Sequence, residues 1–413
     1  MNVLIVNTLY YPQGGAPQYG LMLAKLLSGA GHNPIPFAMK TPHDLPTPYS
    51  KYFVSFIDFK EELRKSSPKS FFKVLSRIFH FSEAAEKIDA LLADVQVDIV
   101  HLNNFLHHIS LSIIEPIKKR RIPIVWSLHD HILVCPNTNL YNDKLGEPCD
   151  LCRNSLKRLV LPPVKRCKKG SFGASLMASL EALYIATKKP ALIPKFFIAP
   201  SHFLVRKHAE MGFDTTRFVV VPNPVDTKFF TPHPEPGNYA LYFGRLSAEK
   251  GLEHMIKAFA MLGKYELIIA GEGPMRAELE KLAETLSAPV RFVGRLVGEK
   301  LRELIYRSRM VILPSVCFEN APLMVLEGMA SAKPILASNI GGIPELVTDD
   351  VGILFEPGRA EGIADAVAKL WNDERKLITM GNNARRRVEE NHSPQVHLVK
   401  ILELYRMAAG GNG

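Results

Sequence analysis

The sequence predicts an α/β protein in which two domains, each a doubly wound parallel sheet, face each other across a cleft. Its 413 residues exceed what one ordinary core holds and suit two domains of about 200 residues each. Short apolar runs alternate with segments of helical period along the whole chain, which is typical of parallel sheets covered by helices. A proline-rich stretch near the middle provides a place where two domains can be joined.

Ten short apolar runs are the predicted strands. The first is short and leads directly into a turn, so it is interpreted as a buried strand and not as a signal peptide. The helical period is clearest after Arg245, where Leu252, Met255 and Phe259 are spaced to share one face. The predicted strands are Val3–Asn7, Ile99–Leu102, Ile124–Ser127, Phe196–Ala199, Ala240–Phe243, Glu266–Ala270, Val290–Val293, Met310–Leu313, Pro334–Ala337 and Ile353–Phe355.

The segment from Val221 to Gly237 is the predicted domain boundary. It holds five prolines, which is typical of a linker and not of a core element. We therefore expect an N-terminal domain over residues 1–221, a C-terminal domain over 222–385, and a final helix over 386–413 that packs back on the N-terminal domain. Ligands of open α/β sheets bind at the carboxyl ends of the strands, so the cleft between the domains is the expected site.

Composition excludes several classes of protein. With 47% hydrophobic and 22% charged residues, the chain is globular and neither disordered nor fibrous. No apolar run reaches the roughly 18–20 residues that a spanning helix needs. We expect a cytoplasmic protein, in which the five cysteines are reduced or metal-bound and not paired in disulfides.

The net charge of +10 has a local origin. Residues 1–221 hold 28 Lys and Arg against 17 Asp and Glu, and residues 153–207 alone hold 12 basic side chains and one acidic one, Glu181. A basic segment of this kind attracts an anionic partner, and an anionic membrane surface at the inner face of the membrane is the expected one. Scarce aromatic residues argue against nucleic acid. A merely solvated basic face and a plain core helix remain alternatives.

Two cations occupy the first of three strand-to-helix junctions in the C-terminal half. Arg245 and Lys250 lie between Gly244 and Gly251, just after a predicted strand. Arginine through paired hydrogen bonds and lysine as a point charge can together neutralise a diphosphate. A surface ion pair would explain the two residues equally well.

The second junction carries two carboxylates. Glu319 is expected in the loop before a helix, and Glu327 about two turns along it. The helix start offers free backbone N–H groups and a positive dipole end to an anion. Two carboxylates beside an anion are explained if they accept hydrogen bonds from sugar hydroxyls. The residues that open the helix, with the first as its N-cap, are Asn320, Ala321, Pro322 and Leu323.

Glycine pairs follow further strands. Gly341 and Gly342 form the third junction, where the backbone can approach a ligand closely. Two other loops are candidates for a nucleobase pocket, through Gly271, Gly273, Arg295 and Leu296.

Together these segments resemble the retaining glycosyltransferases of family 4, which have the GT-B fold. Four ordered motifs carry the resemblance: GRL-x3-KG at Gly244–Gly251, E-x7-E from Glu319 to Glu327, GG-x-PE at Gly341–Glu345 and G-x-LF-x-PG at Gly352–Gly358. The resemblance implies that Arg245 and Lys250 bind the donor diphosphate and that Glu327 hydrogen-bonds the ribose. It also implies that Glu319 contacts the donor sugar beside the anomeric carbon.

The resemblance extends to the predicted N-terminal side of the cleft. It implies that Gly14 and Gly15 touch the donor phosphates or the transferring sugar, and that His129 binds the donor sugar or steadies the acceptor. Asp130 is expected to orient His129 or the acceptor hydroxyl. The motif G-x-G-x-x-G is not found here, which argues against dinucleotide binding.

Two segments depart from the family pattern. Asn320-Ala321-Pro322 stands where the family often has Phe-Gly, and Ala332-Lys333 precedes Pro334 where the family often has glycine. Both lie near the expected sugar pocket, so the donor sugar stays open.

Four cysteines form a C-x13-C-x2-C-x14-C array within an insert at about 135–167. Thiolates at this density can close a tetrahedral structural zinc site, but four free thiols explain the sequence equally well. The residues are Cys135, Cys149, Cys152 and Cys167.

The sequence thus predicts a retaining hexosyltransferase that uses a UDP- or GDP-sugar. The acceptor is expected to be the hydroxyl of a lipid-linked or surface glycan. No D-x-D motif lies where a donor would bind, so no catalytic metal is expected. The alternatives are a sugar-nucleotide epimerase or phosphorylase of the same fold, and a non-catalytic module that binds glycan or lipid.

Overall fold

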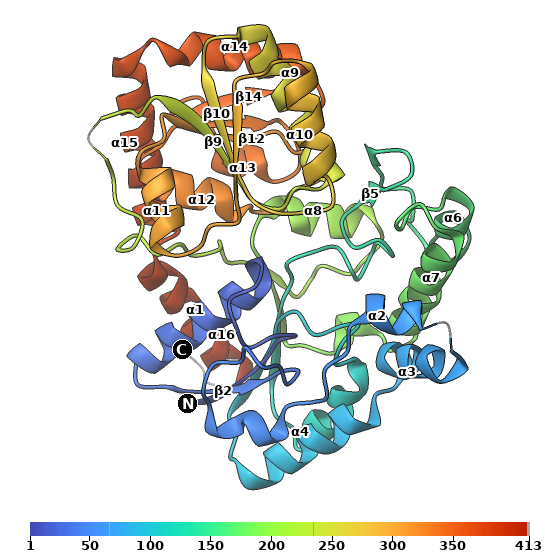
Figure 1. The fold of residues 1–413 in the computed structure, drawn as a ribbon. Helices are drawn as coiled ribbons and strands as arrows, with labels where there is room; N and C mark the ends of the chain where they lie inside the picture. The colour runs from blue at the N-terminus through green and yellow to red at the C-terminus, as the bar shows by residue number, and fades with distance from the viewer. Residues whose placement is uncertain (66, 234, 411–413) are drawn as a thin grey trace.

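The computed structural model describes residues 1–65, 67–233 and 235–410, and it contains two α/β domains stacked one above the other (Figure 1). Each domain is built on a six-stranded sheet in which every strand pairing is parallel. The strand order within each sheet reverses direction once, as in doubly wound folds. The predicted fold class is therefore confirmed.

The strands agree closely with the apolar runs. The N-terminal sheet has the order β2 (Asn33–Phe37), β1 (Asn2–Val6), β3 (Ile99–Leu102), β4 (Ile124–Ser127), β7 (Phe196–Ala199) and β8 (Phe218–Val220). The C-terminal sheet has the order β11 (Val290–Gly294), β10 (Glu266–Ala270), β9 (Tyr239–Phe243), β12 (Met310–Leu313), β13 (Ile335–Ser338) and β14 (Gly352–Phe355). A separate antiparallel pair joins β5 (Tyr141–Asn142) to β6 (Glu147–Pro148).

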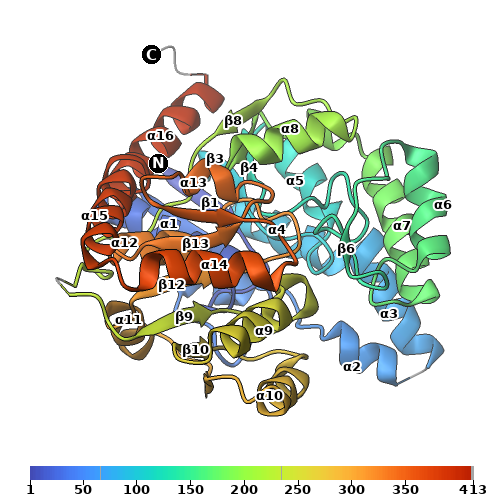
Figure 2. The same ribbon diagram turned by 90° about the horizontal axis from the view of Figure 1, so that it is seen from above.

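Helices cover both faces of the two sheets (Figure 2). Those before the second sheet are α1 (Gly15–Gly29), α2 (Phe59–Arg64), α3 (Pro68–Phe79), α4 (Ser82–Asp94), α5 (Ile114–Lys119), α6 (Ser155–Lys165), α7 (Phe172–Thr187) and α8 (His202–Glu210). Those that follow are α9 (Leu252–Leu262), α10 (Arg276–Thr285), α11 (Glu299–Tyr306), α12 (Leu323–Ala330), α13 (Ile343–Leu346), α14 (Ala360–Trp371), α15 (Glu374–Asn391) and α16 (Pro394–Ala408).

The two edge strands of the N-terminal sheet are not among the predicted strands. β2 contains Pro34 and Pro36, which lack the N–H group that a central strand needs. An edge strand tolerates them because its outer side has no partner strand. β8, at the opposite edge, is only three residues long and too short to show a pattern.

The last helix returns to the N-terminal sheet. α15 packs on α12 and α14, whereas α16 contacts α1 and β4 (Figure 2). Ile401, Leu404 and Tyr405 share a buried cluster with residues of β1, β3 and β4. The returning helix begins at Pro394 and not at residue 386, because Ser393 caps it by accepting a hydrogen bond from the Val396 amide.

Buried hydrogen bonds fasten α16 in place. The two ring nitrogens of His101 lie 2.6 Å from the Tyr405 hydroxyl and 2.7 Å from Ser127 Oγ. The Tyr19 hydroxyl lies 3.2 Å from His397 Nε2. His397 also contacts the proline-rich connection between the sheets, since its Nδ1 lies 2.9 Å from the Pro222 carbonyl oxygen.

The carboxyl ends of both sheets meet at one cleft. The loops after β1, β4 and β7 line it from the N-terminal domain, and the loops after β9, β10, β11 and β12 line it from the C-terminal domain. Strand order reverses beside β1 in one sheet and between β9 and β12 in the other, and doubly wound sheets leave a crevice for a ligand at such points. Within the residues that the structure describes, there is no helix with the length and apolar character to cross a bilayer.

Candidate functional site

A cleft of about 820 Å³ separates the two domains. Its lining includes most of the residues predicted from the sequence, and these come from both sheets. They are Gly14, Gly15, His129, Asp130, Arg245, Lys250, Gly271, Arg295, Leu296, Glu319, Asn320, Ala321, Pro322, Leu323 and Glu327. Three predicted glycines, Gly273, Gly341 and Gly342, lie outside this lining.

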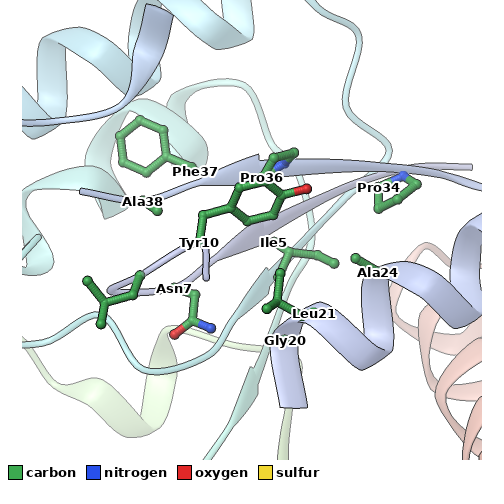
Figure 3. Close-up of a pocket in the computed structure, with 11 residues that line it drawn as sticks. Ile5, Asn7, Tyr10, Gly20, Leu21, Ala24, Pro34, Pro36, Phe37 and Ala38 are labelled. Atoms are coloured by element: carbon green, nitrogen blue, oxygen red, sulfur yellow. The ribbon is translucent and has the colours of Figure 1, made fainter. Parts of the chain in front are cut away.

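A second pocket, between α1 and β2, is much smaller. Figure 3 shows Tyr10, Pro34 and Pro36 among the side chains that enclose it. Its volume of about 10 Å³ holds no more than one water molecule. The large cleft is therefore the candidate site.

The most tightly held side chains of the cleft are Lys250 and Glu319. Lys250 Nζ lies 2.5 Å from Glu319 Oε1, and Ser315 Oγ donates to the same oxygen at 2.7 Å. Lys250 is the last residue of the 3₁₀ turn Ala248–Lys250, which comes after β9, and Glu319 lies in the loop after β12. Because β9 and β12 are neighbours in the sheet, the two side chains meet. Sequence spacing alone could not show this contact.

Both members of the pair carry their charges at neutral pH. Burial acts to raise the pKa of Glu319, but the ammonium of Lys250 and the hydrogen bonds from Lys250 and Ser315 lower it overall. Burial likewise acts to lower the pKa of Lys250, and the Glu319 carboxylate more than offsets this and raises it. A fixed cation and a fixed anion thus face the same cleft.

Backbone packing fixes the loop that carries Glu319. The amide of Gly342 donates to the Glu319 carbonyl at 2.7 Å. A Cβ at Gly341 would lie 2.4 Å from that carbonyl oxygen, and one at Gly342 would lie 2.1 Å from the Asn320 carbonyl. Because Gly341 and Gly342 have no side chains, their loop can pack directly against the loop that carries Glu319. The glycine pair therefore contributes to the site without lining the cleft.

Glu327 differs from Glu319 in having no partner. Among the described residues, its carboxylate makes no hydrogen bond or ion pair, and it lines the cleft from α12. Burial raises the pKa of Glu327 to about 8. An unpartnered carboxylate at a cleft is positioned to accept hydrogen bonds from ligand hydroxyls.

Arg245 is an unpaired cation of the cleft, as is Arg295 among the described residues. Its guanidinium is exposed and forms no ion pair with any described residue. Its loop packs closely on the next one, since a Cβ at Gly271 would lie 1.9 Å from the Gly244 carbonyl oxygen. A Cβ at Gly273 would lie 2.1 Å from the Leu246 carbonyl oxygen. Gly273 is therefore needed for close packing between the two loops, and it does not contact the cleft.

The start of α12 differs from the prediction. The helix begins at Leu323 with Pro322 as its N-cap, and Asn320 does not cap it. The reason is a contact across the cleft, because the Asn320 amide donates to the His129 carbonyl at 3.0 Å. Asn223 likewise donates to the Ala321 carbonyl at 3.3 Å. The first N–H groups of α12 therefore have no side-chain cap.

His129 is oriented by Asn103, a residue that the sequence analysis missed. The Asn103 amide nitrogen donates to the Ala16 carbonyl at 2.9 Å, so its oxygen accepts from His129 Nε2. Burial, and then the nearby His397, lower the pKa of His129 to about 4, which keeps the ring neutral. Asn103 directly follows β3, and its place at a strand end was the available signal.

Asp130 does not orient His129. Asp130 Oδ1 accepts a hydrogen bond from the Ile132 amide at 3.0 Å, two residues further along the chain. This local turn engages one carboxylate oxygen, and Asp130 still lines the cleft, so its contact with the acceptor hydroxyl stays a prediction. Burial raises its pKa.

The glycine pair after β1 lies opposite α12. Gly14 has a φ of 81° and precedes α1, whose start has no side-chain cap. A Cβ at Gly15 would lie 3.6 Å from Leu323 Cδ1 on the other domain. Two uncapped helix starts therefore approach the same cleft from opposite sides, and each provides free N–H groups.

The four cysteines of the insert lie outside the cleft. None of them is disulfide-bonded, and Cys135, Cys152 and Cys167 are buried. Burial, and to a smaller extent the neighbouring thiols, raise their pKa values, that of Cys135 to about 11 and those of the other two to about 12. Across the described residues, no group of three or more His, Cys, Asp or Glu side chains is arranged to hold a metal ion.

Comparisons with known proteins agree with this architecture. The family model described as "Glycosyltransferase Family 4" matches residues 13–229, and that described as "Glycosyl transferases group 1" matches residues 226–387. The structure of Anabaena HepE in complex with UDP and glucose superposes with a TM-score of 0.70 at 18% identity, over 98% of this chain and 99% of that one.

Relatives that match at the level of sequence include the following two. The alpha-D-kanosaminyltransferase of Streptomyces kanamyceticus is 36% identical over 151 residues, which cover 35% of this chain and 39% of that protein. A 42.6 kDa protein in the cps region of Klebsiella pneumoniae is 27% identical over 368 residues, or 84% of this chain and 87% of that protein. The chain thus matches less than half the length of the kanosaminyltransferase.

Two doubly wound parallel sheets around a polar cleft define a protein of the GT-B class, and the predicted GT-B fold is confirmed. The family 4 model covers more than half of the residues. The chain belongs to glycosyltransferase family 4.

Proposed function

We propose that this protein is a retaining glycosyltransferase that moves a sugar from a nucleoside diphosphate-sugar to an acceptor hydroxyl. The observation that carries the proposal is the set of four ionisable groups in one cleft: the Lys250–Glu319 pair, the unpaired Arg245 and the unpartnered Glu327. Family membership and the HepE structure, which was determined with UDP and glucose, support a UDP- or GDP-sugar as donor.

The cations of the cleft receive the diphosphate. Arg245 donates paired hydrogen bonds to the phosphate oxygens. Lys250 donates one N–H to Glu319, and its other two N–H groups are available to the diphosphate. The uncapped start of α12, at Ala321 to Leu323, adds backbone N–H groups. Gly14 and Gly15 approach the phosphates from the opposite wall. These groups stabilise the departing diphosphate and reduce the need for a divalent cation.

The carboxylates and the neighbouring loops hold the sugars and the base. Glu327 accepts hydrogen bonds from the ribose, and Glu319 lies beside the anomeric carbon of the donor sugar. The nucleobase occupies the wall formed by Gly271, Arg295 and Leu296. Since Glu319 is already held by Lys250 and Ser315, it stabilises developing positive charge without reorganising.

Retention follows from attack on the face that the diphosphate leaves. The bond between the anomeric carbon and the phosphate oxygen breaks, the acceptor oxygen bonds to that carbon from the same side, and the acceptor proton passes to the departing phosphate oxygen. His129 is neutral and positioned by Asn103, so it hydrogen-bonds the donor sugar or the acceptor without taking a proton.

The acceptor in this proposal is a lipid-linked or surface glycan, used at the inner face of a membrane. The basic residues of segment 153–207 support a location beside anionic lipid. A structural zinc in the cysteine insert is not required by any step. An epimerase or phosphorylase of the same fold is disfavoured because the set of Arg245, Lys250, Glu319 and Glu327 is complete.

A donor assay tests the proposal. The full chain is incubated with UDP- and GDP-sugars and candidate acceptors, and release of the nucleoside diphosphate is measured together with the anomeric configuration of the product. We expect release that depends on acceptor and a product of retained configuration. An inverted product would reject the retaining mechanism, and no release from any common donor would reject the transferase.

A further inference from the structure

A hairpin of two helices at the edge of the N-terminal domain has no role in the cleft. α6 and α7 lie side by side at one edge of the molecule in both views (Figures 1 and 2). The turn between them spans residues 166–171. We call the exposed side chains of α6, this turn and the start of α7 the α6–α7 surface.

The α6–α7 surface carries a row of exposed apolar side chains. Leu156, Val160 and Val164 are spaced four residues apart on α6, so they share one helix face. Leu156 is 71% exposed and Val164 is 69% exposed, and Phe172 at the start of α7 is 56% exposed. A row of this kind in water leaves apolar area unburied, which marks a contact surface and not an ordinary solvated helix.

The two helices of the hairpin differ in what they expose. The apolar stretch from Leu176 to Tyr184 belongs to α7, which buries much of its apolar side against the domain, including Ala178, Ala182 and Ile185. The exposed apolar face belongs to α6, whose two prolines, Pro162 and Pro163, are buried. A plain core helix therefore describes α7 but not α6.

Basic side chains follow the apolar row at the C-terminal end of α6. Lys165, Arg166, Lys168 and Lys169 lie at the end of α6 and in the turn, between Val164 and Phe172 in sequence. Within the described part of the chain, none of the four forms an ion pair. The single acidic residue of segment 153–207, Glu181, is 5% exposed and lies 2.6 Å from His107, so it does not reduce the surface charge.

We propose that the α6–α7 surface docks the protein on an anionic lipid bilayer. The apolar row enters the interface between headgroups and acyl chains, and the four cations contact anionic headgroups. Charge complementarity favours this partner over a neutral apolar one. Nucleic acid is disfavoured because the surface presents a single exposed aromatic side chain, Phe172, where stacking of successive bases would need several.

The chain connects the α6–α7 surface directly to the cleft. Asp130, Thr138 and Asn139 line the cleft and belong to the segment that leads through the cysteine insert into α6. The relevance of this connection rests on the proposed function, in which a lipid-linked acceptor enters from the N-terminal side. The docking itself does not depend on which sugar is transferred.

Vesicle sedimentation of the full chain tests the proposal. We expect binding to vesicles of phosphatidylcholine with one quarter phosphatidylglycerol, little binding to pure phosphatidylcholine, and release in 1 M NaCl, where screening shortens to about 3 Å. A first variant combines Lys165→Gln, Arg166→Asn, Lys168→Gln and Lys169→Asn. Asparagine is chosen at 166 and 169 because their φ angles are 47° and 55°, which asparagine tolerates. Its affinity for the mixed vesicles should fall by roughly 100-fold.

A second variant replaces the apolar row with Leu156→Ser, Val160→Ser and Val164→Ser. Its affinity should fall by about 10-fold or more, because the apolar area no longer enters the interface. The matched control for charge is Lys257→Gln, Lys281→Gln, Lys369→Gln and Lys376→Gln, on the helices of the C-terminal domain. The matched control for the row is Met261→Ser, Ile378→Ser and Val399→Ser, which are 60%, 43% and 66% exposed.

The controls decide the outcome. Weakened vesicle binding in both test variants but in neither control supports docking through the α6–α7 surface. Unchanged binding in either test variant, or equal loss in a control, overturns it, as does tighter binding to single-stranded poly(U) than to the mixed vesicles. Circular dichroism and release of nucleoside diphosphate with a soluble acceptor analogue establish that each variant is folded. Because vesicle binding is measured without donor, its failure is distinct from failure of the transferase assay.

Discussion

The two walls of the cleft differ in the kind of polar group that they present. The C-terminal wall carries fixed charges, with Lys250 and Glu319 paired at 2.5 Å and Arg245 free. The N-terminal wall carries mainly neutral groups, chiefly the His129 ring held by Asn103 and the backbone of the glycine loop, together with one carboxylate, Asp130. Charge is thus concentrated on the wall where we place the diphosphate, and neutral hydrogen-bonding groups lie where we place the acceptor.

This division has a physical cause in the surroundings of each group. Lys250 and Glu319 are both largely buried, and each stays charged only because the other is adjacent. His129 is also buried, but its nearest polar partners are neutral, so it loses its charge. The same degree of burial therefore gives ions on one wall and a neutral ring on the other. Four experiments test this contrast.

The largest expected effect comes from breaking the charged pair. Lys250→Ala removes a diphosphate ligand and leaves Glu319 buried without its counterion, and Glu319→Gln removes the charge beside the anomeric carbon. Each should lower kcat by about 100-fold or more. The measurement is release of nucleoside diphosphate in the presence of acceptor. Lys257→Ala, on the exposed side of α9, is the control and should keep full activity; retained activity in both site variants would reject the assignment.

Glu327 predicts a pH dependence on the C-terminal wall. An ordinary glutamate titrates near 4.5, and this one at about 8, so the folded chain holds a proton that the unfolded chain has lost. The resulting stabilisation is complete below pH 4.5 and is lost as the pH rises through about 8. Without donor, the free energy of unfolding relative to that of Glu327→Gln should fall by roughly 2–4 kcal/mol between pH 5 and 8.5. Buried neutral histidines such as His129 act in the opposite direction below pH 6.5, but they are present in both chains and cancel in this difference.

Substitution of Glu327 by Gln should remove most of this slope in a denaturant titration repeated across the pH range. Ribose hydroxyls that donate to the carboxylate favour its charged form, so nucleoside diphosphate binding at pH 7 should release about one proton. Calorimetry in buffers of different ionisation enthalpy measures this release. An equal slope and equal proton release in Glu327→Gln would show that another group titrates.

On the neutral wall, we expect a smaller loss. Asn103→Ala removes the acceptor that holds His129, and a neutral hydrogen bond is worth about 1–2 kcal/mol, so kcat/KM should fall by roughly 10-fold. The pH profile of the remaining activity should keep its shape between pH 6 and 8, because His129 is neutral throughout that range. A loss as large as that of Lys250→Ala would contradict the contrast between the walls.

The smallest effect concerns the packing of the walls. Gly271→Ala would bring a Cβ to 1.9 Å from the Gly244 carbonyl oxygen and should destabilise the fold by about 1–3 kcal/mol. Gly15→Ala, on the other wall, meets Leu323 at an ordinary 3.6 Å and should change the free energy of unfolding by less than about 1 kcal/mol. Thermal unfolding of both variants provides the comparison, and equal losses would show that the two walls are packed alike.

Much of the fold could be predicted because strands of parallel sheets are buried on both faces. Their apolar runs, such as Met310–Leu313, are continuous and easy to recognise in the sequence. The edge strand Asn33–Phe37 escaped prediction because its prolines oppose a strand pattern and only its place at the edge permits them. The exposed apolar row of α6 could not be predicted either. In the sequence it resembles the buried face of any amphipathic helix, and only the structure shows that no other part of the described chain covers it.

For the candidate site, the sequence by itself determined which residue types follow which strands. Arg245, Lys250, Glu319 and Glu327 could be placed at the cleft because parallel strands deliver their carboxyl ends to one edge. Only the tertiary structure decided which of them are partners, since Lys250 and Glu319 are far apart in sequence but follow neighbouring strands. It also decided that Asn320 reaches across to the His129 backbone, and that Asn103 and not Asp130 holds the ring. Contacts between loops depend on how distant segments pack in three dimensions, and local sequence patterns do not encode that packing.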